Sequence, residues 1–430
     1  MLILFLLFSK ILTQEIIQLE FTQIENKTIS KEKDPKIIID YLSSNNIETK
    51  IIVGTPKTTL NLLIYFDCYT ICLPNENSIG DYNKLSSKSS SLEFLDTEKK
   101  YVNSYLFKGR KSKETFTFET INNGKKKFES INFIYSSELK NNCSGILGFK
   151  FIENNIKDEL KEYNFINTLK RLNIIENYYF TIKYNGKKKG EIIIGNQPHK
   201  YDKKYNINDY VYTTSKSPTY GHDWAMIFDD IKLGNISLLR YDDYNGGYFL
   251  IEKGFIECPL KMKSFFDIYF KIEIDNGNCF ESEKNKYTKF FYCNNMIKNF
   301  SNLNFYKTDM NYTFSFSKED LFEKIGDYYF FMVVFKKDIR IWNFGKIFFQ
   351  KYQFVFEQNK TQIGIYTHIA SGFNIGIFLI FVFGVVIIIL SSIIYNRLKK
   401  NKWNKLKKAK ELSENDLDFE EDNKKKTLLG

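Results

Sequence analysis

Tyr65-Phe66-Asp67-Cys68-Tyr69-Thr70-Ile71-Cys72-Leu73-Pro74 is the stretch that decides the fold of this chain. It follows Gly54-Thr55-Pro56 and an apolar run that alternates at strand period through Leu60, Leu62 and Ile64. The same frame returns as Phe249-Leu250-Ile251-Glu252-Lys253-Gly254-Phe255-Ile256-Glu257-Cys258-Pro259. In both copies an apolar strand leads into a loop with a carboxylate and ends at a proline. The pattern predicts a duplicated β architecture.

The surrounding sequence also favours β structure. The runs 48–53, 115–118 and 179–183 alternate at strand period, and Asn-Gly pairs predict turns at Gly124, Gly186 and Gly277. Phe165–Leu172 is predicted to be a short helix. Roughly 350 residues between the two apolar ends of the chain are enough for two packed lobes.

Further landmarks follow in order: Ser144-Gly145-Ile146-Leu147-Gly148, 190–195, 224–234, 344–349, 352–356 and 363–364. Together with the two loops they resemble the pepsin-like aspartic peptidase family (A1-type) over nearly the whole region. The resemblance implies a mainly all-β, bilobal fold with lobes at 41–203 and 204–370. The alternative is a surface or adhesion protein with an unrelated β-sandwich fold.

In that family each lobe carries Asp-Thr/Ser-Gly in the strand–turn before the proline, and neither copy here keeps the triplet. A gap-free alignment puts Tyr65 and Leu250 at the two Asp positions, which leaves no catalytic carboxylate. A shift by two residues puts Asp67 and Glu252 there, with Gly254 at the glycine of the second motif. An aspartic peptidase requires two carboxyl groups close enough to share one proton. Both alignments stay open, and the gap-free one is preferred.

The resemblance also directs attention to other side chains. Tyr105 is a weak candidate for the tyrosine that covers the cleft in the family. The family often carries a disulfide in its second lobe, which makes Cys279–Cys293 the expected pair. Cys68 and Cys72 flank the first loop and are interpreted as structural, because no histidine is placed by sequence to activate a thiol.

The two ends of the chain predict a membrane-anchored protein of the secretory route. Residues 1–14 resemble a signal peptide, and residues 15–40 are a candidate pro-segment, whose removal the sequence leaves open. Ile375–Tyr395 carries no charge and is long enough to cross a bilayer. Lysines and an arginine follow it, which places the tail 396–430 in the cytosol. We expect a type I single-pass protein at the cell surface or in an endolysosomal compartment.

Composition agrees with a lumenal ectodomain. Six Asn-x-Ser/Thr sequons precede the apolar segment, at Asn26, Asn142, Asn235, Asn299, Asn311 and Asn359. The formal net charge is +11, but the lysines are interleaved with Asp and Glu along the chain, so we expect no nucleic-acid partner. We also expect no metal or other cofactor, and a monomer.

These observations lead to two functional hypotheses. The first is an inactive pepsin-like protein that binds a peptide or protein segment in the cleft between its lobes. The second is an active membrane-bound aspartic endopeptidase that uses Asp67 and Glu252. Whether the chain is an enzyme therefore depends on the two loops.

Overall fold

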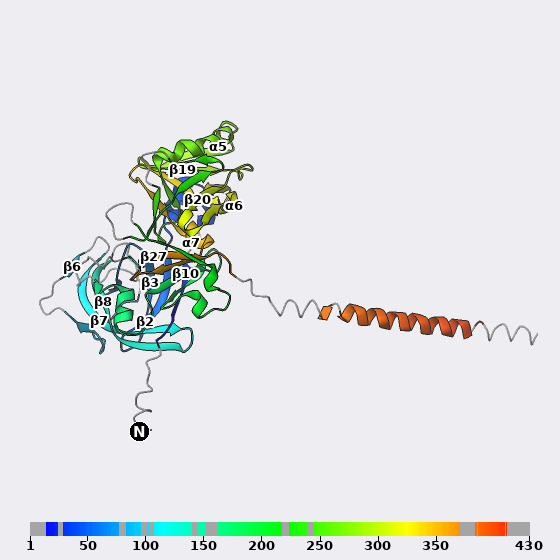
Figure 1. Cartoon of the computed structure of the whole chain (residues 1–430), viewed down its shortest axis with the longest axis horizontal. Helices are drawn as coiled ribbons and strands as arrows, with labels where there is room; N and C mark the ends of the chain where they lie inside the picture. The colour runs from blue at the N-terminus through cyan, green and yellow to red at the C-terminus, as the bar shows by residue number, and fades with distance from the viewer. Residues whose placement is uncertain are drawn as a thin grey trace, which may run out of the picture. The chain divides into compact units, whose positions relative to one another are not determined.

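The computed structural model describes residues 14–24, 29–76, 83–95, 101–103, 107–139, 145–151, 161–216, 223–239, 245–369, 383–384, 386–408 and 410. The residues up to Ile369 form one compact unit, and those from Ala370 onward form a second (Figure 1). The first unit holds both copies of the repeated frame and is predominantly β structure, as the sequence predicts.

The largest sheet is formed by strands from the first half of the chain and two later strands, β26 and β27. Among the described residues it has 14 strands, in the order β12-β27-β26-β10-β11-β1-β2-β3-β9-β4-β8-β7-β5, with β6 beside β7. Their bounds are β1 Ile17–Gln23, β2 Ile47–Val53, β3 Thr58–Tyr65, β4 Ile71–Pro74, β5 Glu93–Phe94, β6 Tyr101–Asn103, β7 Phe107–Thr120, β8 Gly124–Leu139, β9 Ile146–Gly148, β10 Tyr179–Tyr184, β11 Lys189–Ile194, β12 Tyr210–Thr214, β26 Phe354–Glu357 and β27 Gln362–Tyr366.

Two further sheets are built from the second half. Within the described part, one has nine strands in the order β13-β16-β25-β17-β24-β19-β23-β22, with β18 beside β19, and the other has the order β15-β14-β20-β21. Their bounds are β13 Ala225–Ile227, β14 Asp230–Leu233, β15 Ile236–Ser237, β16 Gly246–Phe249, β17 Ile256–Pro259, β18 Cys279–Asn285, β19 Thr288–Cys293, β20 Leu303–Lys307, β21 Tyr312–Phe316, β22 Phe322–Ile325, β23 Tyr328–Phe331, β24 Val333–Lys336 and β25 Trp342–Phe344.

Helices are short and few. Among the described residues of the first unit, the α-helices are α2 Pro35–Leu42, α4 Phe165–Arg171, α5 Lys263–Asp275, α6 Lys318–Leu321 and α7 Lys346–Lys351. Five 3₁₀ turns are found in the same described ranges: η1 Ile29–Lys31, η3 Pro198–Lys200, η4 Ile207–Asp209, η5 Leu260–Met262 and η6 Thr308–Met310. Helix α4 confirms the helix predicted from Phe165, and Asn164 caps it by accepting the backbone N–H of Asn167.

Local sequence explains most of these elements. Strand β1 buries Ile17, Leu19 and Phe21 and exposes alternate residues, so its side chains divide between core and solvent. The predicted turn at Gly124 joins β7 to β8, and the one at Gly186 joins β10 to β11. Gly277 plays a different part, because it follows the C-terminal cap of α5 with a φ of +70°.

The repeated frame forms the same arrangement twice. In the first copy, β9 lies parallel to β3 and antiparallel to β4. In the second, β25 lies parallel to β16 and antiparallel to β17. Each loop that carries a carboxylate therefore connects two strands that are both paired with the same third strand, and the duplicated architecture predicted from sequence is confirmed.

The candidate pro-segment at 15–40 contains β1, which pairs with β11 from Ile17↔Ile194 to Thr22↔Lys189. Helix α2 starts at Pro35, and Asp34 caps it by accepting the N–H of Lys36. The lobe boundaries and the removal of this segment remain predictions.

Nearly all of the predicted signal peptide at 1–14 and much of the predicted span at Ile375–Tyr395 lie outside the described residues. Residues 386–408 are helical. Within the described part of the chain, no helix combines the length and apolar character needed to cross a membrane.

Candidate active-site loops

Two glycines show that the loops occupy equivalent positions. A Cβ on Gly148 would lie 2.2 Å from the Cys68 oxygen and 2.7 Å from the Thr70 oxygen. A Cβ on Gly345 would lie 2.4 Å from the Lys253 oxygen and 2.3 Å from the Phe255 oxygen. Only glycine permits this approach of one backbone to another.

These contacts fix how the two loops correspond. In the first loop the two carbonyl groups near the glycine belong to the third and fifth residues after Tyr65. In the second loop they belong to the third and fifth residues after Leu250. Tyr65 is therefore equivalent to Leu250, and Asp67 to Glu252. This equivalence holds in both alignments of the sequence.

Tyr65 is the last residue of β3 and pairs with Gly148, and its carbonyl accepts the N–H of Phe149 at 2.8 Å. Its partly buried ring packs on a small cluster that includes Leu63, Cys68 and Ile146. Leu250 is also partly buried, and its N–H donates to the Phe344 carbonyl at 3.0 Å. Neither side chain supplies an acid.

Phe66 lies at the centre of an aromatic cluster. Its ring is 1% exposed, and its centroid lies 5.2 to 6.3 Å from the centroids of Phe149, Phe180, Phe349 and Phe356. The backbone N–H of Phe66 points to the other loop and donates to Oε2 of Glu252 at 3.1 Å. The two loops therefore meet directly.

Burial dominates the electrostatics of Glu252. The residue keeps some solvent access, but dense protein around its carboxyl group raises the pKa to about 7. Hydrogen bonds and the nearby Lys253 ammonium oppose this effect, and the charge of Asp67 adds to it. Among the described residues no hydrogen bond joins the carboxyl groups of Asp67 and Glu252.

Asp67 instead forms an ion pair with Lys150. Its Oδ1 lies 2.9 Å from Nζ of Lys150, and the same ammonium lies 2.9 Å from Oδ1 of Asp223. Burial lowers the pKa of Lys150, but the two carboxylates outweigh burial and the net shift is upward. Lys150 thus stays protonated and links the first loop to the segment that precedes β13.

A third segment holds the second loop. The N–H of Asn45 donates to the Glu252 carbonyl at 2.8 Å, and its side-chain amide donates to the Ile251 carbonyl at 2.7 Å. Gly254 donates to the Ser43 carbonyl at 3.2 Å, and a Cβ on Gly254 would fall 1.6 Å from the Leu42 oxygen. The glycine is needed here for contact with the end of α2.

The remaining predicted residues are distributed as follows. The structure contains the predicted Cys279–Cys293 disulfide, across paired strands β18 and β19. Cys68 and Cys72 are buried, and Sγ of Cys68 donates to the Thr70 carbonyl at 3.4 Å. Tyr105, Asn26 and Asn142 lie outside the described residues, whereas Asn235, Asn299, Asn311 and Asn359 are exposed. Within the described chain no group of His, Cys, Asp and Glu forms a metal site.

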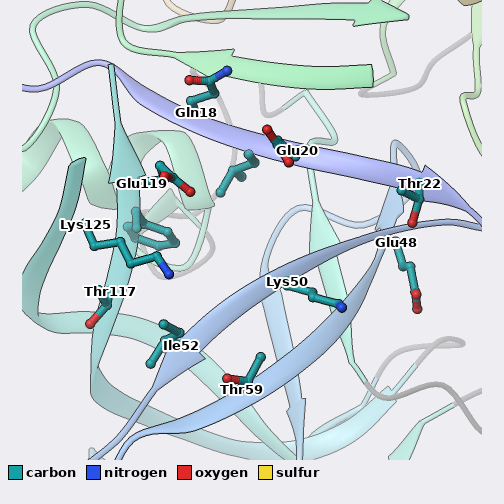
Figure 2. A pocket seen from close by; sticks show the side chains of 12 residues that line it. Gln18, Glu20, Thr22, Glu48, Lys50, Ile52, Thr59, Thr117, Glu119 and Lys125 are labelled. Carbon is teal, nitrogen blue, oxygen red and sulfur yellow. The ribbon is translucent and has the colours of Figure 1, made fainter. Parts of the chain in front are cut away.

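One hollow in the described part of the chain lies away from these loops. It measures about 370 Å³ and lies on the polar face of β1, β2, β3 and β7. Figure 2 shows Gln18, Glu20 and Thr22 along β1, with Lys50 and Lys125 reaching in from neighbouring segments. Its lining combines acids, lysines and threonines, and it includes no residue of either loop.

The sequence model of the eukaryotic aspartyl protease family matches residues 48–368. The chain belongs to this family. Among solved structures, basic 7S globulin from soybean is similar with a TM-score of 0.56 and 12% sequence identity, over 84% of this chain and 100% of the globulin. At that identity the likeness concerns the fold alone. No curated protein matches the chain in sequence.

The chain belongs to the eukaryotic aspartyl protease family, but its two loops lack the pair of carboxyl groups in direct contact that aspartic proteases use. A shared proton requires two carboxyl groups in direct contact. Here one carboxylate binds an ammonium, and the other binds a backbone N–H. Whether Asp67 and Glu252 have a catalytic role remains a prediction.

Sequence reasoning missed Lys150, Asp223 and Asn45. Lys150 comes two residues after the Gly148 landmark, so a cation close to the loop was visible in the sequence. Its pairing with Asp223 depends on the tertiary fold, and no local pattern reveals it.

Proposed function

We propose that this member of the eukaryotic aspartyl protease family is a membrane-anchored protein of the secretory route that has lost peptidase activity and binds a polypeptide segment between its lobes. One observation carries the loss of activity. Asp67 is neutralised by Lys150, and Glu252 is occupied by the N–H of Phe66. With an ammonium on one carboxyl group and a backbone N–H on the other, the pair has no shared proton to transfer.

Retention of the two-lobed fold supports a binding role. The loops still meet, and a small hollow lies beside Lys253 of the second loop. A polypeptide can bind there through backbone hydrogen bonds without being cut.

The membrane and secretory parts of the proposal rest on sequence, with some structural support. The apolar stretch Ile375–Tyr395 is followed by a basic segment, and the exposed sequons precede it. A disulfide in the second half of the chain suits an oxidising compartment. Carbonate extraction of cells that express the full chain should leave it in the membrane pellet, and deletion of 370–430 should release it. Release of the intact chain by carbonate would contradict the anchor.

Activity is tested with the full-length protein purified in detergent. It is incubated with a mixed peptide library from pH 3 to pH 8, and products are identified by mass spectrometry. We expect no cleavage above that of Asp67→Ala and Glu252→Gln variants. Cleavage that disappears in both variants would overturn the loss of activity.

The second candidate is an active endopeptidase that uses Asp67 and Glu252. The raised pKa of Glu252, at about 7, favours it, because a carboxyl group that stays protonated near neutral pH is one half of an acid–base pair. An active dyad predicts tight binding of a statine-type transition-state mimic. A protein without a dyad binds it weakly, so titration calorimetry with that mimic separates the two functions.

A further inference from the structure

A hollow of about 190 Å³ borders the second loop. The end of α2, Lys253, β17, the β18–β19 turn and β24 form its wall. It is smaller than the cavities of roughly 300 to 1,000 Å³ that enclose whole small-molecule ligands. Its size suits one side chain of a longer ligand.

The charged residues in its wall are predominantly basic. Lys253, Lys284 and Lys336 contribute ammonium groups, and Glu257 contributes the one carboxylate among the lining residues described. Glu257 is already bound, since Oε2 accepts from Asn343 at 2.7 Å and Oε1 lies 3.3 Å from Nζ of Lys336. It is therefore not available to balance the other two lysines.

The lysines differ in their partners. Nζ of Lys284 lies 2.6 Å from Oδ1 of Asp40 and 3.0 Å from the hydroxyl of Ser43. Lys253 has no hydrogen-bond or ion-pair partner for its side chain among the described residues. Its neighbour Glu252 directs Oε2 to Phe66 instead. One cation of the hollow thus has no direct ion-pair partner among the described residues, although its charge acts on the nearby carboxyl group of Glu252.

We propose that this hollow receives the carboxylate of an acidic side chain in a bound polypeptide, with Lys253 as its counter-charge. The inference rests on the proposed peptide-binding function and names the class of ligand for it. An ammonium in a concave, partly desolvated wall attracts an anion more strongly than one on an open surface.

The test measures peptide binding by fluorescence anisotropy on the full-length protein in detergent. Three labelled pools of random octapeptides differ at one position, which is fixed as Glu, Gln or Lys. Unlabelled N-acetylglutamate serves as a free carboxylate competitor. The variants are Lys253→Gln, Lys253→Arg, and Lys271→Gln as a control at an exposed position of α5.

We expect the wild type to bind the Glu pool about fivefold more tightly than the Gln pool, the range of one partly exposed ion pair. Lys253→Gln should abolish this preference, whereas Lys253→Arg and Lys271→Gln should keep it. Retention of the preference in Lys253→Gln would overturn the assignment to this hollow, and so would loss of it in Lys271→Gln.

Other outcomes separate this inference from the function on which it rests. Equal binding of all pools by the wild type would overturn acidic selection and leave peptide binding intact. Binding of no pool would contradict peptide binding itself, and this inference with it. Displacement by N-acetylglutamate at the same concentration as by an unlabelled Glu pool would overturn a polypeptide as the source of the carboxylate.

Discussion

At the scale of single residues, the carboxyl group of Glu252 makes the stability of the fold depend on pH. Its pKa is raised to about 7 in the folded state, mainly by burial, whereas the ordinary value is 4.5. The folded chain therefore binds this proton more tightly than the unfolded chain. The cost of burying the charge is absent below about pH 4.5, grows between about pH 4.5 and pH 7, and is complete above about pH 7.

The Glu252→Gln variant removes that dependence. Its amide oxygen can still accept the N–H of Phe66, but no charge is buried at high pH. We expect its free energy of unfolding to exceed that of the wild type by about 1–3 kcal/mol at pH 8 and to match it at pH 4.5. Urea denaturation across this range measures the difference, with the exposed Glu129→Gln as control. A wild type that gains stability from pH 5 to pH 8 relative to the variant would contradict it.

Gly254 gives a second prediction at this scale. A Cβ there would meet the Leu42 carbonyl oxygen at 1.6 Å, so Gly254→Ala must displace the loop or the end of α2. We expect a loss of about 3 kcal/mol or more in the free energy of unfolding. Gly277→Ala is the control, because it has a φ of +70° but open space around it, and should cost about 1 kcal/mol. Equal losses in the two variants would show that the approach of Leu42 does not make Gly254 more sensitive than a glycine in open space.

The sequence placed Gly254 in a motif but for a different reason. In the shifted alignment it stands for the glycine of the family triplet. The structure adds a physical cause, the approach of Leu42, which lies more than two hundred residues away in sequence. No local pattern contains that partner, so the position was recognisable and its role was not.

At the scale of elements, alternation and turn residues predicted β2, β10 and α4 well, because these signals are local. Asn276-Gly277 also forms the predicted turn, but it follows helix α5 rather than a strand. An Asn-Gly pair supplies a positive φ, and both hairpins and helix ends use it. The element that precedes the pair determines whether the pair forms a hairpin turn or a helix end, and helix α5 was not predicted from the sequence.

The hairpin of β18 and β19 offers the test at this scale. The Cys279–Cys293 disulfide closes a loop with a sequence separation of 14. Cross-links over loops of this length stabilise by about 3 kcal/mol through the entropy of the unfolded chain. The Cys279→Ala/Cys293→Ala variant should have a free energy of unfolding about 2–3 kcal/mol lower than the wild type, measured by urea denaturation. Reduction of the wild type should have the same effect. A variant as stable as the oxidised wild type would contradict the prediction.

At the scale of the whole molecule, the order of the landmarks predicted the fold, because most of them are short strands that carry or adjoin a glycine. The contacts between halves of the unit were beyond prediction. Lys150 joins Asp67 to Asp223 across a long stretch of chain. Charges of this kind are spread through the sequence, and spacing alone does not select the pairs.

Lys150→Gln should leave Asp67 and Asp223 close together without their shared cation. We expect a loss of about 1–2 kcal/mol at low salt, a modest value because all three side chains are partly exposed. Added salt should reduce the loss by screening the two carboxylates. Lys150→Arg is the control that keeps the charge. A loss that does not change between about 0.05 M salt, where screening is weak, and about 0.5 M salt, where it is strong, would assign the loss to packing instead.

The aromatic cluster gives the last prediction, which concerns cooperativity. Phe66 from the first loop packs on Phe349 and Phe356 from the last part of the unit, and one continuous core includes residues of both halves. The two halves should therefore unfold in one transition, with coincident changes in near-UV and far-UV circular dichroism. Phe66→Ala removes a fully buried ring and should cost about 3–5 kcal/mol while keeping the transition single. If the two signals instead separated in the wild type, the lobes would be independent folding units. If they separated only in Phe66→Ala, this one ring would be what couples the lobes.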